Sequence, residues 1–115
     1  MEVDSSGEIV VLSQGRCPWK EHLFTLEEKA GIAGTIKYVL YADDSGKWRI
    51  QCVPKVLGSF GDRKSLPEAW RGVRDEQLSE LTGIPGCVFV HASGFIGGNA
   101  TRDGVLKMAR AALKM

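Results

Sequence analysis

Hydrophobic and polar residues alternate most clearly over residues 35–40 and 47–52. Apolar side chains occupy every second position in both segments: Ile36, Tyr38 and Leu40 in the first, and Trp48, Ile50 and Cys52 in the second. A period of two is typical of a strand with one buried face. The four residues 43–46 (DDSG) between the segments are strong turn formers. The pattern therefore predicts a β-hairpin.

Two elements are expected before the hairpin. Residues 8–13 form a short β-branched run, which predicts a strand. Pro18 suits the first position of a helix, and Gly31 suits its end. Apolar residues with helical spacing lie between them, namely Trp19, Leu23, Leu26 and Ala30. After the hairpin, residues 54–67 read as a long loop, which is typical of a functional or mobile segment.

The C-terminal half alternates helices and strands. Asp75 is expected to cap a short helix that faces Leu78 and Leu81 inward and ends at Gly83. Residues 87–91 are apolar on both faces, as in a central strand covered on both sides. Residues 94–99 read as a glycine-rich loop. Residues 101–114 predict a closing helix whose inner side carries Val105, Met108, Ala109 and Ala112.

This order, β-α-β-β-α-β-α, is close to a ferredoxin-like layout with an extra helix. We expect an α+β fold in one domain over residues 1–115. Its sheet should be mixed and mostly antiparallel, with the helices packed mainly on one face.

Composition narrows the possible functions. The 115 residues carry 15 Lys and Arg against 14 Asp and Glu, a net charge of +1. This balance argues against nucleic-acid binding by bulk charge alone. Apolar runs fall short of the roughly 18 residues of a membrane span, and the first residues do not resemble a signal peptide. We therefore expect an intracellular protein with no membrane contact, whose sparse cysteines (Cys17, Cys52 and Cys87) are buried thiols.

One segment, residues 91–102, looks suited to binding a ligand. Its glycines allow close approach of a ligand to the backbone, and the helix start after them offers unpaired N–H groups and a positive dipole end. Together these favour an anion, most often phosphate, and Arg102 could hold it in a bidentate contact. The candidate substrate-binding residues are His91, Ser93, Gly94, Gly97, Gly98, Asn99, Thr101 and Arg102. Alternatively, the glycines only permit a tight crossing from strand to helix.

Other chemistry has weaker support. His91 and Ser93 could form a nucleophilic pair, but the usual glycine-flanked serine and a nearby carboxylate are missing, so His91 is a substrate contact or a strand-end histidine. Metal-ligand spacing is absent, and acidic residues such as Glu27 fit solvated helix faces. Trp48 and Arg49 could stack bases and hold phosphates, or Trp48 could belong to the core. We expect no catalytic residue, metal ligand or cofactor in this chain.

Four motifs resemble one known family. They are residues 17–22 (CPWKEH), 48–54 (WRIQCVP), 66–72 (LPEAWRG) and, most specifically, 83–98 (GIPGCVFVHASGFIGG). Over about residues 8–112 the chain resembles the C-terminal part of the melanocyte-proliferating-gene exonuclease family. That family is also labelled an uncharacterised protein family and a "metal-dependent protein hydrolase", and belongs to the DHH phosphoesterase superfamily.

The resemblance implies a substrate-binding C-terminal domain of a 3′–5′ RNA exonuclease of nucleus and mitochondrion, inactive on its own. A divalent metal, usually manganese, would belong to an N-terminal catalytic domain that is absent here. Its partners would be RNA or a nucleotide phosphate, that catalytic domain, and possibly further copies of the protein. Gly97, Gly98 and Asn99 match a Gly-Gly-His-type substrate loop, although Asn99 replaces the histidine and could not shuttle a proton. The alternative is a structural or oligomerisation module that packs on the catalytic domain.

Overall fold

The computed structural model describes residues 2–3, 7–12, 19–31, 35–43, 45–55, 61 and 63–114. Its elements in chain order are β1 (Glu2–Val3), β2 (Ile9–Val11), α1 (Trp19–Ala30), β3 (Tyr38–Ala42), β4 (Trp48–Cys52), the 3₁₀ helix η1 (Glu68–Trp70), α2 (Asp75–Thr82), β5 (Cys87–Val90), β6 (Ile96–Asn99) and α3 (Arg102–Leu113). Cys17, Pro18 and the side chain of Trp19 lie outside the described residues. Every described helix falls short of the length and apolar character that a bilayer crossing demands.

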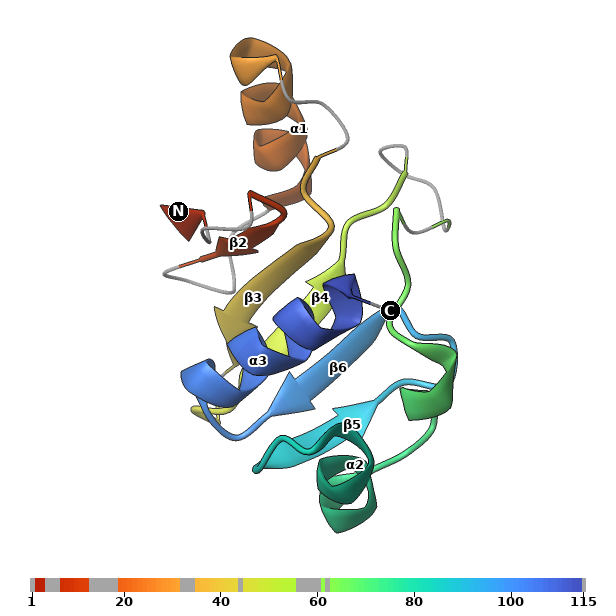
Figure 1. The fold of residues 1–115 in the computed structure, drawn as a ribbon. Helices are drawn as coiled ribbons and strands as arrows, with labels where there is room; N and C mark the ends of the chain where they lie inside the picture. Colours follow the sequence, from red (N-terminus) through yellow and green to blue (C-terminus); the bar gives the residue numbers. More distant parts are fainter. Residues whose placement is uncertain are drawn as a thin grey trace.

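The strands form one six-stranded sheet in the order β1-β2-β3-β4-β6-β5 (Figure 1). Only the β2–β3 pair is parallel; the other four pairs are antiparallel. The expected hairpin is confirmed as β3 and β4, which pair from Tyr38 opposite Cys52 to Ala42 opposite Trp48. The expected α+β class, with a mixed and mostly antiparallel sheet, is therefore confirmed.

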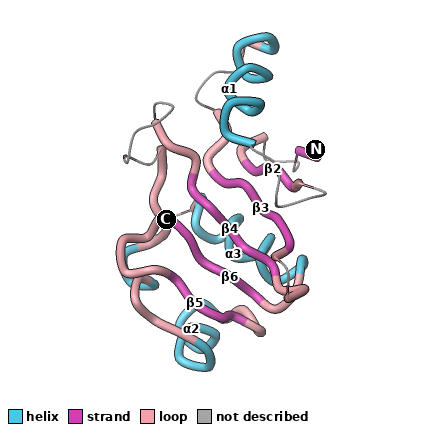
Figure 2. Tube along the Cα trace, turned by 180° about the vertical axis from the view of Figure 1, so that it is seen from behind, coloured by secondary structure: helices cyan, strands magenta, loops and turns pink. Residues whose placement is uncertain are grey.

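Two hydrophobic clusters lie on opposite faces of the sheet. The larger cluster lies beneath α3, α2 and η1, and the four inward residues predicted for α3 are all buried in it: Val105, Met108, Ala109 and Ala112. The smaller cluster joins β2 and β3 to Leu23 of α1. Seen from behind, none of the described helices lies on β4, β6 and β5 (Figure 2). We call this uncovered surface the open face.

The inner side of α1 differs from the expected apolar stripe. Leu23 is buried as expected, but Leu26 is 39% exposed and Ala30 is exposed. Glu27, expected on a solvated face, is buried because Arg63 pairs with both of its carboxylate oxygens at 2.8 Å. The ion pair rotates the buried side of the helix away from the apolar spacing.

The segment expected as a glycine-rich loop is largely a strand. Residues 96–99 form β6, which pairs with β4 on one side and β5 on the other. A Cβ on Gly97 would lie 3.0 Å from the Phe89 carbonyl oxygen, and one on Gly98 would lie 3.2 Å from the Trp48 carbonyl oxygen. Close packing within the sheet, rather than loop freedom, accounts for these two glycines.

The expectation of a central strand at residues 87–91 is also wrong. β5 is the last strand of the sheet, and its register shifts between Cys87 and Phe89. Its outer side is covered by residues 72–74, where the Gly72 N–H donates to the Val90 carbonyl at 2.8 Å and Arg74 bridges to Phe89.

The short helix α2 begins one residue earlier than expected. Arg74, not Asp75, occupies the N-cap position, and Asp75 is the first helical residue with φ of +52°. Arg74 is extended and bridges with β5, and the chain turns into the helix directly after it, at Asp75. Leu78 is buried but Leu81 is 51% exposed, since this eight-residue helix packs only a narrow side.

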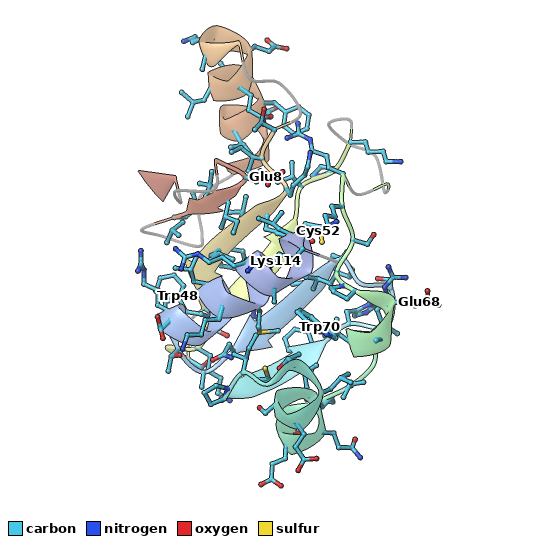
Figure 3. All side chains as sticks on the ribbon, viewed as in Figure 1. Glu8, Trp48, Cys52, Glu68, Trp70 and Lys114 are labelled. Carbon is cyan, nitrogen blue, oxygen red and sulfur yellow. The ribbon has the colours of Figure 1, made fainter. Side chains whose placement is uncertain are left out.

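Trp48 lies where β4 begins, close to the start of α3 (Figure 3). It is partly buried and packs against the larger hydrophobic cluster. Cys52 and Cys87 are buried free thiols, as expected, whereas Cys17 lies outside the described residues.

Candidate functional site

A row of five residues crosses the open face perpendicular to the strands. In β-sheet register Tyr41 lies opposite Arg49, Arg49 opposite Gly98, and Gly98 opposite Phe89. Phe89 in turn bridges to Arg74. Directly opposed residues on paired strands project their side chains from the same face. The row therefore places two cations and two aromatic rings around Gly98, the one position in the row without a side chain.

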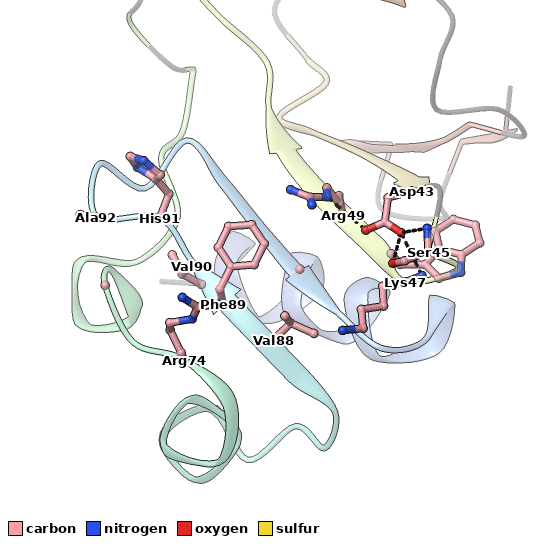
Figure 4. Close-up of a pocket in the computed structure, with 13 residues that line it drawn as sticks. Asp43, Ser45, Lys47, Arg49, Arg74, Val88, Phe89, Val90, His91 and Ala92 are labelled. Carbon is pink, nitrogen blue, oxygen red and sulfur yellow. Dashed lines mark hydrogen bonds and ion pairs between the residues drawn. The ribbon is translucent and has the colours of Figure 1, made fainter.

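A groove of about 600 Å³ opens along this row (Figure 4). Arg49 and Lys47 line it from the hairpin, Phe89 and His91 from β5 and its end, and Arg74 from the segment outside β5. Gly98 lies between these two sides. We call this space the open-face groove.

Arg49 is held in place from one side. Its Nε donates to Asp43 Oδ2 at 3.3 Å, and its guanidinium carbon lies 5.4 Å from the centre of the Phe89 ring. The side chain is 39% exposed. Because Asp43 contacts only Nε, the two terminal nitrogens of the guanidinium are not taken up by hydrogen bonds or ion pairs with the described residues, and they can serve a ligand of the open-face groove.

The β3–β4 turn fixes the carboxylate that orients Arg49. Asp43 Oδ1 accepts the Ser45 hydroxyl at 2.6 Å, the Ser45 N–H at 2.8 Å and the Lys47 N–H at 3.1 Å. The hydrogen bond from the Ser45 hydroxyl is the main reason that the pKa of Asp43 lies below its ordinary value. Asp43 is therefore ionised at neutral pH, where Arg49 would bind an anion.

Gly98 permits the contact between Arg49 and Phe89. A Cβ there would lie 3.1 Å from Phe89 Cε1, so the ring rests directly on the glycine backbone. Arg49 and Phe89 are on strands separated by β6, and a larger residue between them would hold them apart.

The charge of the open-face groove is positive. Lys47 and Arg74 make no ion pair with any residue in the described part of the chain, and Asp43 is the acidic residue that lines the groove beside Arg49. An anion could therefore bind without first displacing an internal carboxylate from either of these two cations.

Of the eight predicted site residues, Gly97, Gly98 and Asn99 lie within β6, and the other five fall into two groups beyond its opposite ends. His91, Ser93 and Gly94 lie in the turn before the strand, and Thr101 and Arg102 lie after it at the start of α3. A strand rises about 3.3 Å per residue, so β6 holds the two groups roughly 10 Å or more apart. Two predicted residues, His91 and Gly98, line the open-face groove.

His91 and Ser93 form a local turn. The Ser93 N–H donates to His91 Nδ1 at 3.1 Å, and the Ser93 hydroxyl lies 2.9 Å from the same nitrogen. Because a backbone N–H can only donate, Nδ1 is an acceptor and the neutral ring carries its proton on Nε2. His91 can thus offer a hydrogen-bond donor to a ligand. Phe95 supports the ring edge-on, at 4.9 Å between centroids.

At the other end of β6, Asn99 and Thr101 use their polar side-chain atoms in hydrogen bonds within the fold. Asn99 is fully buried; its amide donates to the Pro85 carbonyl at 3.0 Å and accepts the Thr101 N–H at 3.0 Å. Thr101 caps α3 by accepting the Gly104 N–H at 2.9 Å. A side chain at Gly104 would overlap the Asn99 amide. The binding role of these two residues remains a prediction.

Phe89, Arg74 and Lys47 were not predicted from the sequence, although all three line the open-face groove. Arg49 was considered only beside Trp48, which packs against the larger hydrophobic cluster and is also among the residues that line the groove. The alternation in β4 already placed Arg49 opposite the core side. The available signal was a cation on the polar face of a predicted strand; the pairing of Arg49 with Gly98 became apparent only in the structure.

Comparison with known proteins identifies the family. The model of a family described as "Uncharacterised protein family (UPF0160)", with the label MYG1 exonuclease, matches residues 1–113. The chain belongs to the MYG1 exonuclease family.

Relatives of this family are similar over nearly the whole chain. The "MYG1 exonuclease" of Rattus norvegicus is 61% identical over 112 residues, which cover 97% of this chain and 29% of the relative. The Homo sapiens "MYG1 exonuclease" is also 61% identical, with 97% and 30% covered. The "MYG1 protein" of Dictyostelium discoideum is 56% identical over 108 residues, with 94% and 32% covered. No solved structure matches this chain significantly.

The chain spans about a third of the length of these relatives. Within the described residues, the structure brings together no group of three or more His, Cys, Asp or Glu side chains that could hold a metal ion. The divalent metal that the resemblance implies is expected in a separate catalytic domain, so this finding does not bear on that metal.

Proposed function

We propose that this chain is the substrate-binding domain of a MYG1-family RNA exonuclease and that its open-face groove holds nucleotide phosphates. One observation carries the proposal: Lys47, Arg49 and Arg74 surround the half-buried ring of Phe89 in a groove of about 600 Å³. Cations that hold phosphates, combined with an aromatic ring that stacks a base, are the usual means of binding single-stranded nucleic acid.

Several aspects of the proposal concern the longer protein. They are the DHH-type architecture, the C-terminal place of this domain, the 3′–5′ direction of digestion and the nuclear and mitochondrial location. A divalent metal, manganese in particular, would belong to the separate catalytic domain. In this division of labour the present chain binds and orients the substrate, and the catalytic domain cleaves it.

The proposal moves the phosphate contact away from the helix start. The polar side chains of Asn99 and Thr101 are already engaged within the fold, whereas the terminal guanidinium nitrogens of Arg49 face a groove. His91 and Gly98 are shared by the two versions of the site. His91 would donate a hydrogen bond from Nε2, and Gly98 would form the floor.

A second function uses the same surface differently. The open face could pack against the rest of the protein or against another copy, because a sheet face without helices is a common interface. In that case Lys37 and Arg49, both on the hairpin, would contribute to assembly rather than to substrate binding.

The test is a titration of the 115-residue chain with a short single-stranded RNA, in which binding is monitored through the amide signals in NMR spectra. We expect shifts at residues 43–49, 72–74, 88–92 and 98, and a loss of affinity of about tenfold or more in Arg49→Ala, since a hydrogen bond to a charged group contributes roughly 1.5–3 kcal/mol. Lys107→Ala is the matched control, because Lys107 is an exposed cation on α3 that pairs with Asp103.

Other outcomes point elsewhere. Shifts confined to residues 99–104 would return the site to the helix start. An Arg49→Ala variant of the longer protein that assembles poorly but keeps its KM would favour the interface function.

A further inference from the structure

The row across the open face also indicates how a ligand lies in the groove. We infer that the groove takes a single-stranded oligonucleotide laid across the strands, with phosphates bound on both sides of Phe89, rather than one terminal phosphate. This inference rests on the proposed function and adds the length and direction of the bound segment.

The direction follows from the register. Arg49, Gly98, Phe89 and Arg74 occupy four neighbouring strand positions. Neighbouring strands lie about 4.8 Å apart, so the backbones at Arg49 and Arg74 are separated by roughly 14 Å. A ligand that contacts both arginines must therefore run along the row and across the strands.

The charges set the number of phosphates. Lys47 and Arg49 flank Phe89 from the hairpin, and Arg74 flanks it from the segment outside β5 (Figure 4). Asp43 holds Arg49 by Nε on the hairpin side of the ring. A nucleoside monophosphate has a single phosphate group for these separated cations, whereas an oligonucleotide offers one phosphate per linkage to each side.

The ring explains why the segment would be single-stranded. The guanidinium of Arg49 lies over Phe89, and both groups present flat surfaces on which an unpaired base can stack. In a duplex the bases stack on one another and do not offer a free face. Stacking tolerates any base, so we expect little sequence preference from this groove.

The experiment compares the salt dependence of binding for adenosine monophosphate and a single-stranded RNA tetranucleotide. Each phosphate neutralised on a single strand contributes a slope of about −0.7 to log K against log salt concentration. Three cations predict a slope of about −2 for the tetranucleotide, against about −0.7 for the monophosphate. Arg74→Ala and Lys47→Ala should each reduce the tetranucleotide slope by about 0.7, and Lys107→Ala should leave it unchanged.

The possible failures are distinguishable. Equal slopes for the two ligands, or a tetranucleotide slope that Arg74→Ala leaves unchanged, would overturn the two-sided contact. The proposed function would still stand if RNA binding depended on Arg49. No RNA binding at all would refute both. Equally tight binding of a glutamate tetrapeptide, unaffected by Phe89→Leu, would instead identify the groove as a site for acidic peptides.

Discussion

Two arginines in this domain have similar surroundings and different roles. Arg63 lies 4.8 Å from the Phe24 ring and Arg49 lies 5.4 Å from the Phe89 ring, and each pairs with a carboxylate. Arg63, however, is 8% exposed and uses both terminal nitrogens on Glu27 and one of them on the Ile36 carbonyl. Arg49 is 39% exposed and contacts its carboxylate only through Nε.

The difference shows what makes a charged side chain available. A buried arginine must have its charge and donors satisfied within the fold, because an unpaired buried charge is costly. A half-exposed arginine can be oriented by one contact and leave the rest of its donors to a ligand. The contacts of Arg63 therefore suit a role in stability, and those of Arg49 suit the binding role proposed above.

The largest expected effect comes from breaking the buried pair. Arg63→Ala leaves the Glu27 carboxylate buried without its partner, which should lower the free energy of unfolding by about 3–5 kcal/mol. Chemical denaturation measures this loss. The double variant Glu27→Leu, Arg63→Met should recover much of it, because an apolar pair of similar volume removes the uncompensated charge. A loss below 1 kcal/mol in Arg63→Ala would contradict the structural role.

Filling the gap beneath Phe89 should have the next largest effect. The Cβ of Gly98→Ala would meet Phe89 Cε1 at 3.1 Å and the Trp48 carbonyl oxygen at 3.2 Å, so we expect a loss of about 1–3 kcal/mol of stability. RNA affinity should fall as well, since Phe89 moves. In the control Gly61→Ala, the atom nearest to the new Cβ is Lys55 Cδ at 3.7 Å, so stability and RNA affinity should both stay unchanged.

Removing the carboxylate that orients Arg49 should separate binding from stability. Asp43→Asn keeps an oxygen for the turn but loses the ion pair, and an exposed ion pair contributes under about 1 kcal/mol to stability. RNA affinity should fall several-fold while the denaturation midpoint barely changes. If RNA affinity were retained in Asp43→Asn, Arg49 would not depend on this carboxylate for its orientation.

The smallest expected effect is on the titration of Asp43 itself. Its pKa lies below the ordinary value of 3.8, mainly because of the hydrogen bond from the Ser45 hydroxyl. Ser45→Ala should therefore raise this pKa toward 3.8, measured by NMR of the carboxyl carbon. Because the pKa of Asp43 is lowered in the fold, its ionised carboxylate stabilises the folded state at pH values above the ordinary pKa. This stabilisation is lost as the pH falls through the lowered pKa. A pKa unchanged in Ser45→Ala would assign the shift to other contacts.

The parts of the fold that the sequence predicted well depend on local patterns. The β3–β4 hairpin follows from alternation around a strong turn, and α3 follows from the helical spacing of its apolar residues. β6 could not be recognised in this way, because Gly97 and Gly98 carry no side chain that would show a period of two. Only pairing with both neighbouring strands identifies it as a strand.

The candidate site was harder to predict because it combines distant segments. Arg49, Phe89 and Arg74 come together through strand register and an isolated bridge, neither of which is apparent in local spacing. The ion pair of Glu27 and Arg63 joins positions 36 residues apart for the same reason. His91 and Gly98 were found because they belong to the unusual glycine segment itself.

The segment that carries Arg74 has a second consequence. By pairing with β5 it covers the backbone groups at the outer edge of the sheet, which in an unprotected strand invite pairing with another chain. Loosening residues 72–74 would thus displace Arg74 from the open-face groove and expose an aggregation-prone edge in the same event. For this domain, resistance to self-association and the shape of the open-face groove depend on the same three residues.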